Sequence, residues 1–434
     1  KSLNDIEKGM FEAFAMFEKD GATDRDIERI KAGLETGFYN GISSVLGKSF
    51  QLAQYNTFTG DPGFIEKDIE NIKKVTKEDV MRVYNTYIKD KPYVITSFVP
   101  KGQMDLIAEN STKAPVVEEE IKENVAAVIE ETKEEIVKTP SKIDRSIEPE
   151  QGASPSLNVP TSWTSDLANG MKVYGIEQNE IPTVNFSIRI DGGHLLDDMN
   201  KNGVANLMTD IMMEGTKNKT PEQLEEEIEM LGASINMYTS DEAITIRGNT
   251  LVRNFDKTIA LVKEILLEPR WDEEEFARIK TSTINGIKRS DANPNVVADR
   301  VYSKLLYGEN HIFSYPTSGT VASVEAITID DLKSFYTKNF SPSISTIHVV
   351  GKINKDQVLT TLKGLETDWA AKEVSIPEYP IVNNRDKSSL YFVDIPDAKQ
   401  SVISIGNIGL SRTDKDFFPA EVMNYKLGGS FSGN

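Results

Sequence analysis

The sequence predicts an α+β fold in which mainly antiparallel sheets carry helices packed on one face. Short segments of alternating apolar and polar residues are joined by tight turns, as at Asn169-Gly170, which is typical of antiparallel hairpins. Long amphipathic helices follow groups of strands instead of alternating with single strands, and this favours segregated layers over a doubly wound sheet. An internal repeat indicates that the same unit occurs more than once.

The bulk composition limits the classes of protein and partner. A chain of 434 residues predicts two or three domains. The net charge of -19 argues against nucleic acid as the main partner, because phosphate binding requires clustered Lys and Arg. There are no cysteines, which excludes thiol catalysis and zinc-thiolate sites. No run of about 18 apolar residues is present, so we expect no membrane span.

Residues 1–103 predict helices followed by a closing strand. An amphipathic helix is already under way at the first residues, which leads us to expect an internal piece of a longer polypeptide. A second helix opens at Thr76, a suitable N-cap, and the apolar segment Tyr93–Val99 predicts a strand. Residues 104–160 are rich in Glu and Lys and then in Pro and Ser, and they predict a linker with a charged surface helix over Val116–Val137.

Residues 161–370 predict a complete domain, and residues 371–434 the start of another. In the first we expect strands at Lys172–Ile176, Val184–Ile190, Ala233–Tyr238, Ala243–Gly248 and around Ile347. The expected helices are Gly203–Met213, one that opens at Thr220-Pro221, Phe255–Leu267, Glu273–Ser290, Val297–Leu306 and Asp330–Asn339. In the second we expect strands at Ser389–Val393 and Ser401–Ile405 and a helix at Phe417–Leu427.

The repeat is visible as two ordered pairs of similar segments. Residues 75–84 match residues 327–336, and residues 26–31 match residues 275–280, so both pairs are separated by about 250 residues. In each copy a helix that opens at Thr is followed by an apolar strand. We therefore interpret the similarity as true repetition.

The three histidines lie far apart in the sequence and form no local metal motif. His194 follows two glycines at the end of a strand, which indicates a turn or hydrogen-bonding role. His311 lies in a loop and is interpreted as structural. His348 lies in an apolar strand, where we expect a core residue with satisfied hydrogen bonds.

The segment Gly203–Thr216 resembles the signature helix of the inverted zincins, in which His-x-x-Glu-His stands between a Gly-apolar-Ala start and a Gly-Thr end. Asn206, Thr209 and Asp210 stand where that family has a zinc-binding His, a catalytic Glu and a second zinc-binding His. An amide, a hydroxyl and one carboxylate do not make a zinc site. We therefore expect no metal and no catalytic residue in this chain. Met208, Ile211 and Met212 on the same helix are expected in the core.

With this helix, the whole chain resembles the pitrilysin/insulinase family of zinc metallopeptidases. Residues 1–103 look like the C-terminal part of a second family domain, 161–370 like a third domain with a degenerate zinc motif, and 371–434 like the start of a fourth. Further matching phrases are 167–173, Leu305-Leu306-Tyr307-Gly308, Phe335-Tyr336, Val350-Gly351, 397–401 and 424–429. The resemblance implies a clamshell of two homologous halves around a chamber.

The resemblance also assigns two further positions. Gly286 stands where the family has its third zinc ligand, a Glu on a downstream helix, so the departure extends to every ligand position. Gly428, Gly429 and Ser430 align with a glycine-rich loop that is associated with substrate handling in some members, although such a loop is more often a plain turn.

Three functions are compatible with the sequence, and the first is the one that we expect. The first is the non-catalytic, peptide-enclosing half of a zinc endopeptidase that acts on unfolded peptides, with zinc and the active site in an N-terminal half outside this segment. In that case a peptide would add as a strand at the exposed edge of the 161–370 sheet. The second is a non-enzymatic peptide-binding or structural subunit of the same family, and the third is an unrelated α+β binding protein. A bacterial periplasmic or envelope location is what family habit implies.

Overall fold

The computed structural model describes residues 2–113, 144, 147, 152–153, 156, 158–396 and 398–429. The surface helix expected over Val116–Val137 lies outside the described residues, as do Asp397 and Ser430. The chain forms two compact units. The first comprises residues 1–23 and 77–160, and the second comprises residues 24–76 and 161–434. The expected domain boundaries at 103, 160 and 370 stay predictions.

The first unit is built on two helices, α1 (Leu3–Asp20) and α5 (Lys77–Tyr87). The rings of Phe17 and Tyr84 meet edge to face with centroids 4.9 Å apart. The Tyr84 hydroxyl donates a hydrogen bond to the Glu18 carboxylate at 2.9 Å. These contacts join the two helices although their sequences lie far apart.

The expected strand at Tyr93–Val99 is wrong. The segment is irregular in the structure, and the side chains of Val94 and Phe98 are 90% and 87% exposed. A strand needs a hydrogen-bonded neighbour, and the pairs of the described residues give this segment none. The apolar composition of the segment alone was therefore not enough to predict a strand.

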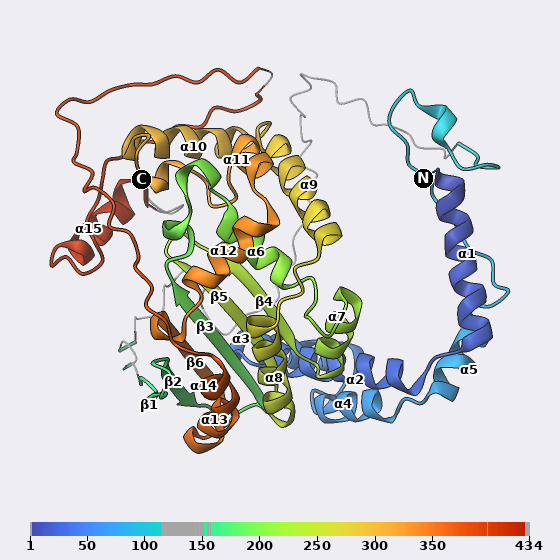
Figure 1. The fold of residues 1–434 in the computed structure, drawn as a ribbon. Helices are drawn as coiled ribbons and strands as arrows, with labels where there is room; N and C mark the ends of the chain where they lie inside the picture. Colours follow the sequence, from blue (N-terminus) through green and yellow to red (C-terminus); the bar gives the residue numbers. More distant parts are fainter. Residues whose placement is uncertain are drawn as a thin grey trace. The chain divides into compact units, whose positions relative to one another are not determined.

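The second unit contains a six-stranded sheet with the order β1-β2-β6-β3-β5-β4 (Figure 1). All neighbouring strands are antiparallel except β2 and β6, which are parallel. The α+β class and the mainly antiparallel sheet are therefore confirmed. The strands are β1 (Ser162–Asp166), β2 (Lys172–Glu177), β3 (Thr183–Asp191), β4 (Ser234–Thr239), β5 (Ala243–Leu251) and β6 (Ser345–Gly351).

Helices pack on one face of this sheet, and their apolar side chains form one core with the inward residues of the strands (Figure 1). They are α6 (Val204–Met212), α7 (Pro221–Met230), α8 (Phe255–Leu267), α9 (Glu273–Ser290), α11 (Val321–Ala326), α12 (Ile329–Asn339), α13 (Lys355–Thr361) and α14 (Lys363–Asp368). Helix α10 (Pro294–Tyr307) contributes no residue to this core, and none of its residues is buried. The side chains of Met208, Ile211 and Met212 are at most 1% exposed, as expected.

Strand β1 was not expected from the sequence. It pairs with β2 through the Asn169-Gly170 turn, and its Trp163 ring lies over Gly175. A Cβ on Gly175 would lie 2.1 Å from that ring, so only glycine leaves room for it. The polar residues of β1 hid it from the apolar pattern.

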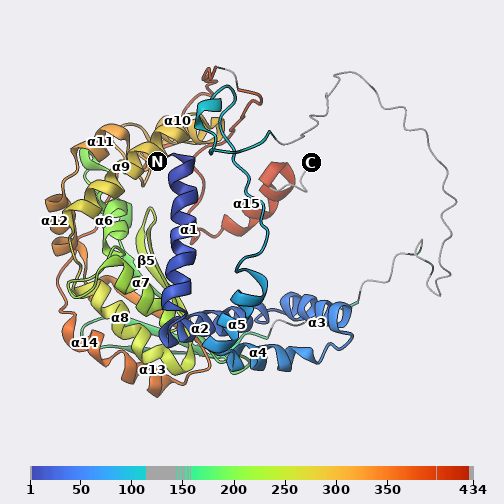
Figure 2. The ribbon, with the colours of Figure 1, turned by 90° about the vertical axis from the view of Figure 1, so that its right-hand side faces the viewer.

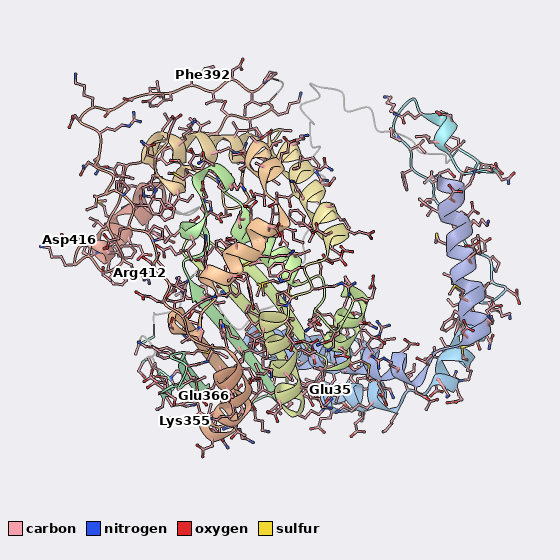
Figure 3. The ribbon with its side chains drawn as sticks, viewed as in Figure 1. Glu35, Lys355, Glu366, Phe392, Arg412 and Asp416 are labelled. Atoms are coloured by element: carbon pink, nitrogen blue, oxygen red, sulfur yellow. The ribbon has the colours of Figure 1, made fainter. Side chains whose placement is uncertain are left out.

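Three helices from the start of the chain belong to the second unit and pack together (Figure 2). They are α2 (Asp24–Gly41), α3 (Val45–Thr59) and α4 (Phe64–Lys74). Helix α2 contacts α7 through the Arg25–Glu226 and Arg29–Glu229 ion pairs. The buried carboxylate of Glu35, labelled in Figure 3, pairs with Arg253, and this hydrogen bond lowers the pKa of Glu35.

The two strands expected at Ser389–Val393 and Ser401–Ile405 are also wrong. Residues 371–411 are irregular among the described positions, and Leu390 and Ile403 are 100% and 82% exposed. Phe392 lies on this segment (Figure 3). The expected helix is present as α15 (Phe417–Asn424), which continues into one π-helical turn, Tyr425–Gly429.

His348 is not a core residue. It lies on β6, where Ile347 and Val349 point into the core and His348 is exposed on the opposite face. Its ring stacks on Tyr174 with centroids 5.2 Å apart. Side chains alternate along a strand, and the sequence does not distinguish a strand buried on both faces from this one.

Candidate functional site

Helix α6 begins at Gly203, whose φ of 103° favours glycine. A Cβ there would lie 3.0 Å from the Ser318 carbonyl oxygen. The helix start has no cap from its own N-cap side chain. Instead, the Asp197 carboxylate accepts hydrogen bonds from the backbone N–H groups of Gly203 and Ala205, both at 2.9 Å. Asp197 therefore provides the N-terminal cap and places a negative charge at the positive end of the helix.

A fully buried histidine extends this cap. His194 Nδ1 lies 2.9 Å from Asp197 Oδ2, and Nε2 lies 3.2 Å from the carbonyl oxygen of Tyr315. Both side chains are 0% exposed. The pair joins the end of β3, the start of α6 and the loop around Tyr315, which agrees with the hydrogen-bonding role expected for His194. Asp197 was not among the residues predicted from the sequence, although a carboxylate a few residues before the helix was a usable signal.

Asn206 and Asp210 lie one turn apart on α6, and the Asn206 amide donates a hydrogen bond to Asp210 Oδ2 at 3.2 Å. Desolvation, with the nearby charge of Glu214 as a smaller cause, raises the pKa of Asp210 to about 6. Thr209 is fully buried and donates to the Asn206 carbonyl oxygen at 2.8 Å. These three side chains thus bind one another or the helix backbone.

Gly286 lies on α9, the helix that approaches α6. The Arg278 guanidinium of α9 forms an ion pair with Glu214, just after the end of α6. A Cβ built on Gly286 would have no atom within 4 Å, so the position is open. The position predicted to match the family's third zinc ligand therefore contributes no side chain.

The residues present do not fit a zinc ion. Zinc takes His, Cys or carboxylate ligands in a tetrahedral set, and here one carboxylate stands beside an amide, an inward hydroxyl and a glycine. Within the described ranges, no group of three or more His, Cys, Asp or Glu side chains is arranged to hold a metal. The assignment of the four positions to a lost zinc site stays a prediction.

Strand β4 forms one edge of the sheet and lies beside α6. The Thr239 hydroxyl of β4 donates to the Ala205 carbonyl oxygen at 2.9 Å. Within the part of the chain that the structure describes, β4 pairs with one strand, β5, so its other edge has no strand partner, and α6 lies beside β4. The sequence alone could not identify this strand as the edge.

The remaining candidates have local structural explanations. His311 caps the short helix Ile312–Ser314, accepting from the Phe313 N–H at 3.2 Å, and burial lowers its pKa. Gly428 has a φ of 132° inside the π-helical turn, which is consistent with a turn. No helix among the described residues has the length and apolarity to cross a membrane.

Replacing Asp210 by Asn is expected to stabilise the second unit at neutral pH. The folded-state pKa of about 6 lies above the usual value of 3.8, so folding favours the protonated carboxyl. That contribution to stability is full below about pH 4 and is lost as the pH rises through about 6. We expect Asp210→Asn to gain about 1–3 kcal/mol at about pH 7.5 and almost nothing at about pH 4, measured as the free energy of urea unfolding.

Asp198→Asn provides the matched control for that experiment. Asp198 is an exposed carboxylate near the same helix, where it accepts only the Asn200 N–H. If Asp210→Asn raised the free energy of unfolding equally at both pH values, ionisation of Asp210 would not be the cause of the destabilisation.

Comparison with protein families supports the resemblance drawn from the helix. Residues 172–314 match the family model described as Insulinase (Peptidase family M16), and residues 326–434 match the model described as Peptidase M16 inactive domain. Together the two matches span more than half of the chain and cover both α6 and α9.

Three curated relatives show the range of proteins to which the chain is similar. A probable mitochondrial-processing peptidase subunit beta from Arabidopsis thaliana is 24% identical over 63% of this chain and 51% of its own length. An uncharacterised zinc protease from Streptomyces coelicolor is 22% identical over 61% of this chain and 59% of its own length. A non-peptidase homolog from Helicobacter pylori is 25% identical over 59% of each chain. The matches thus span little more than half the length of these relatives.

Among solved structures, the crystal structure of a peptidase M16 inactive domain from Pseudomonas fluorescens matches with a TM-score of 0.48. It is 23% identical and covers 51% of this chain and 54% of that chain. On the two family matches and the frame of α6, the chain belongs to peptidase family M16, the insulinase family, whose members include zinc proteases.

Proposed function

We propose that this chain supplies the non-catalytic half of an M16 protein, which encloses unfolded polypeptide while zinc and cleavage belong to an N-terminal half. In this proposal the two halves form the clamshell typical of the family. Residues 1–103, 161–370 and 371–434 are then parts of three successive family domains, with 104–160 as the linker.

The observation that carries the proposal is the state of helix α6. Its start is fixed by Gly203 and the Asp197 cap, whereas Asn206, Thr209 and Asp210 bond to one another or to the helix backbone. A well-anchored helix that offers one carboxylate at these positions supports a structural role, because zinc catalysis needs three protein ligands and a bound water.

The free edge of β4 supports the peptide-binding part of the proposal. An extended peptide can add to a sheet edge through backbone hydrogen bonds, which require little of its sequence. This edge lies beside α6, where members with an intact motif would hold the metal. The turn at Gly428 and Gly429, with Ser430, is proposed as a further contact for substrate.

A non-enzymatic peptide-binding or structural subunit is the second candidate. The specific observation in its favour is the relative from Helicobacter pylori that is named a non-peptidase homolog. The two candidates differ outside this segment: an intact His-x-x-Glu-His in an N-terminal half selects the enzyme. A periplasmic or envelope location, which cell fractionation tests, is part of the same proposal and rests on the family alone.

The purified chain is expected to bind unfolded peptide without cleaving it. The assay incubates the 434-residue chain with a fluorogenic unfolded peptide and added zinc, with and without a chelator, and follows binding of the same peptide by fluorescence anisotropy. We expect anisotropy to rise while hydrolysis stays at the level of the buffer blank. Hydrolysis that the chelator abolishes would contradict the proposal, as would a failure to bind any unfolded peptide.

A further inference from the structure

The face of the sheet opposite the helices of the core presents polar side chains in ordered rows. We call it the open face. Its central row runs across five strands, because the register pairs place the residues side by side. The row consists of Tyr174, His348, Ser187, Arg247 and Asn236.

Two flanking rows complete the open face. The register pairs align Lys172, Thr346, Arg189, Thr245 and Tyr238 on one side, and Ile176, Val350, Asn185, Asn249 and Ser234 on the other. The inward residues between them, such as Ile188 and Ile246, are at most 1% exposed. The alternation thus separates a dry core face from a mainly polar face, on which Thr245 is buried and Asn249 contacts α2 while Arg247 and His348 are exposed.

The charge of the open face contrasts with that of the whole protein. The three rows contain three cations, Lys172, Arg189 and Arg247, and strand β1 adds a carboxylate to one row, because Asp166 is the register partner of Lys172. Asp191, the next outward residue on β3, pairs with Arg189 at 2.8 Å. Arg247 differs from the other two cations, because its register partners are Ser187 and Asn236 and it forms no ion pair within the described residues. In a chain with a net charge of -19, such a cation attracts a negatively charged partner.

The ring of Tyr238 holds the Arg247 side chain in one orientation. It is exposed at the centre of the face, and its guanidinium lies 5.4 Å from the centroid of the Tyr238 ring on β4. This stacking leaves the N–H edges of the guanidinium free to bind a carboxylate bidentately. His348, stacked on Tyr174, lies in the same row.

Amide side chains and a shallow depression adjoin Arg247. Asn249 donates to Asn185 at 2.8 Å and accepts from Asn40 of α2 at 3.0 Å. The depression has a volume of about 360 Å³ and is lined by residues of β3, β4, β5 and β6, including Arg247, Asn236 and His348. Amides beside a cation can bind the backbone of a ligand whose carboxylate binds the cation.

We propose that the open face binds acidic, extended segments of polypeptide, with Arg247 receiving a carboxylate side chain. This inference rests on the proposed function and extends it, because it names the chemical class of peptide that the non-catalytic half would bind.

The spacing of the cations fits an extended chain. Arg189 and Arg247 lie diagonally on neighbouring strands, since Ser187 is the register partner of Arg247. Such diagonal positions are about 7–8 Å apart, and side chains on one side of an extended peptide recur about every 7 Å. One acid of such a peptide can therefore bind Arg247 while a second, two residues along, lies next to Arg189, which Asp191 already pairs. Net acidity disfavours a nucleic acid, whose phosphates would be repelled elsewhere on the chain.

The test measures binding of labelled peptides to the whole chain by fluorescence anisotropy at about 50 mM and about 500 mM salt. The probes are a peptide of about 12 residues that alternates Glu and Ser and the same peptide with Gln in place of Glu. We expect the acidic peptide to bind at least about tenfold more tightly at low salt and to lose that advantage at high salt. Arg247→Gln should weaken the acidic peptide about five- to tenfold and leave the Gln peptide unchanged.

Arg412→Gln is the matched control, because Arg412 also lies over an aromatic ring, that of Phe417, but next to α15 (Figure 3). It should change neither affinity, and the thermal unfolding midpoint of both variants should equal that of the parent chain. Equal affinity for the two peptides would overturn this inference and leave the proposed function standing, whereas no binding of either peptide would overturn both. A single-stranded RNA that binds more tightly than the acidic peptide and is lost in Arg247→Gln would assign the face to nucleic acid instead.

Discussion

Replacing Asp197 by Ala is expected to destabilise the second unit by about 3–5 kcal/mol, because its carboxylate is a buried charge with three partners. It caps the backbone N–H groups of Gly203 and Ala205 and faces His194 Nδ1, all at 2.9 Å. Alanine leaves the two N–H groups and a buried imidazole without acceptors, and each unsatisfied group costs about 1–3 kcal/mol. Most domains have only about 5–15 kcal/mol of stability, so the loss would be evident in urea unfolding.

Asp198→Ala is the neighbouring control, since Asp198 is exposed and bonds only the Asn200 N–H. We expect it to cost at most about 1 kcal/mol. An equal cost for the two alanine variants would show that the Asp197 cap does not hold α6 in place.

Local chemistry in the sequence predicted the helices of the second unit well. Residues 255–267 and 273–290 form helices with the expected bounds, and Thr220 caps α7 with Pro221 at its first position. Caps, prolines and long apolar stripes act within a few residues, so they can be recognised without knowledge of the fold.

A strand forms only where another strand pairs with it, and local sequence patterns do not show which segments will pair. Tyr93–Val99, Ser389–Val393 and Ser401–Ile405 have the composition of strands and form none, whereas the polar β1 forms a strand because a hairpin brings it to β2. The energy of a strand lies in cross-strand bonds and side-chain pairs, which are properties of the sheet.

The candidate site could be predicted only in part, because some of its contacts are local in the sequence and others join distant segments. The i, i+4 spacing placed Asn206 and Asp210 on one side of a helix, and the structure brings their side chains together. The Asp197–His194 pair and the exposure of His348 depend on how loops and strands meet, which local patterns do not contain. The open face likewise became visible only with the register of five strands.

Restoring ligands at the degenerate positions is expected to create zinc binding. The variant carries Asn206→His, Asp210→His and Gly286→Glu, and it should hold one zinc ion with a Kd of about 1 µM or tighter, against no measurable site in the parent chain. The two histidines share one side of α6, as the Asn206–Asp210 hydrogen bond shows. Isothermal titration with zinc, with metal retention after gel filtration, measures the difference.

The third ligand distinguishes a restored site from adventitious binding by two histidines. Arg278 of α9 forms an ion pair with Glu214, just after the end of α6. Gly286 lies further along α9, the helix that contacts α6. Its empty surroundings leave room for a Glu side chain. The variant with both histidines but with Gly286 unchanged should therefore bind zinc at least about tenfold more weakly, because it lacks one charged ligand. If the triple variant retained no more zinc than the parent chain, α6 would not be the remnant of a metal-binding helix, and the proposed division into a cutting half and an enclosing half would lose its main support.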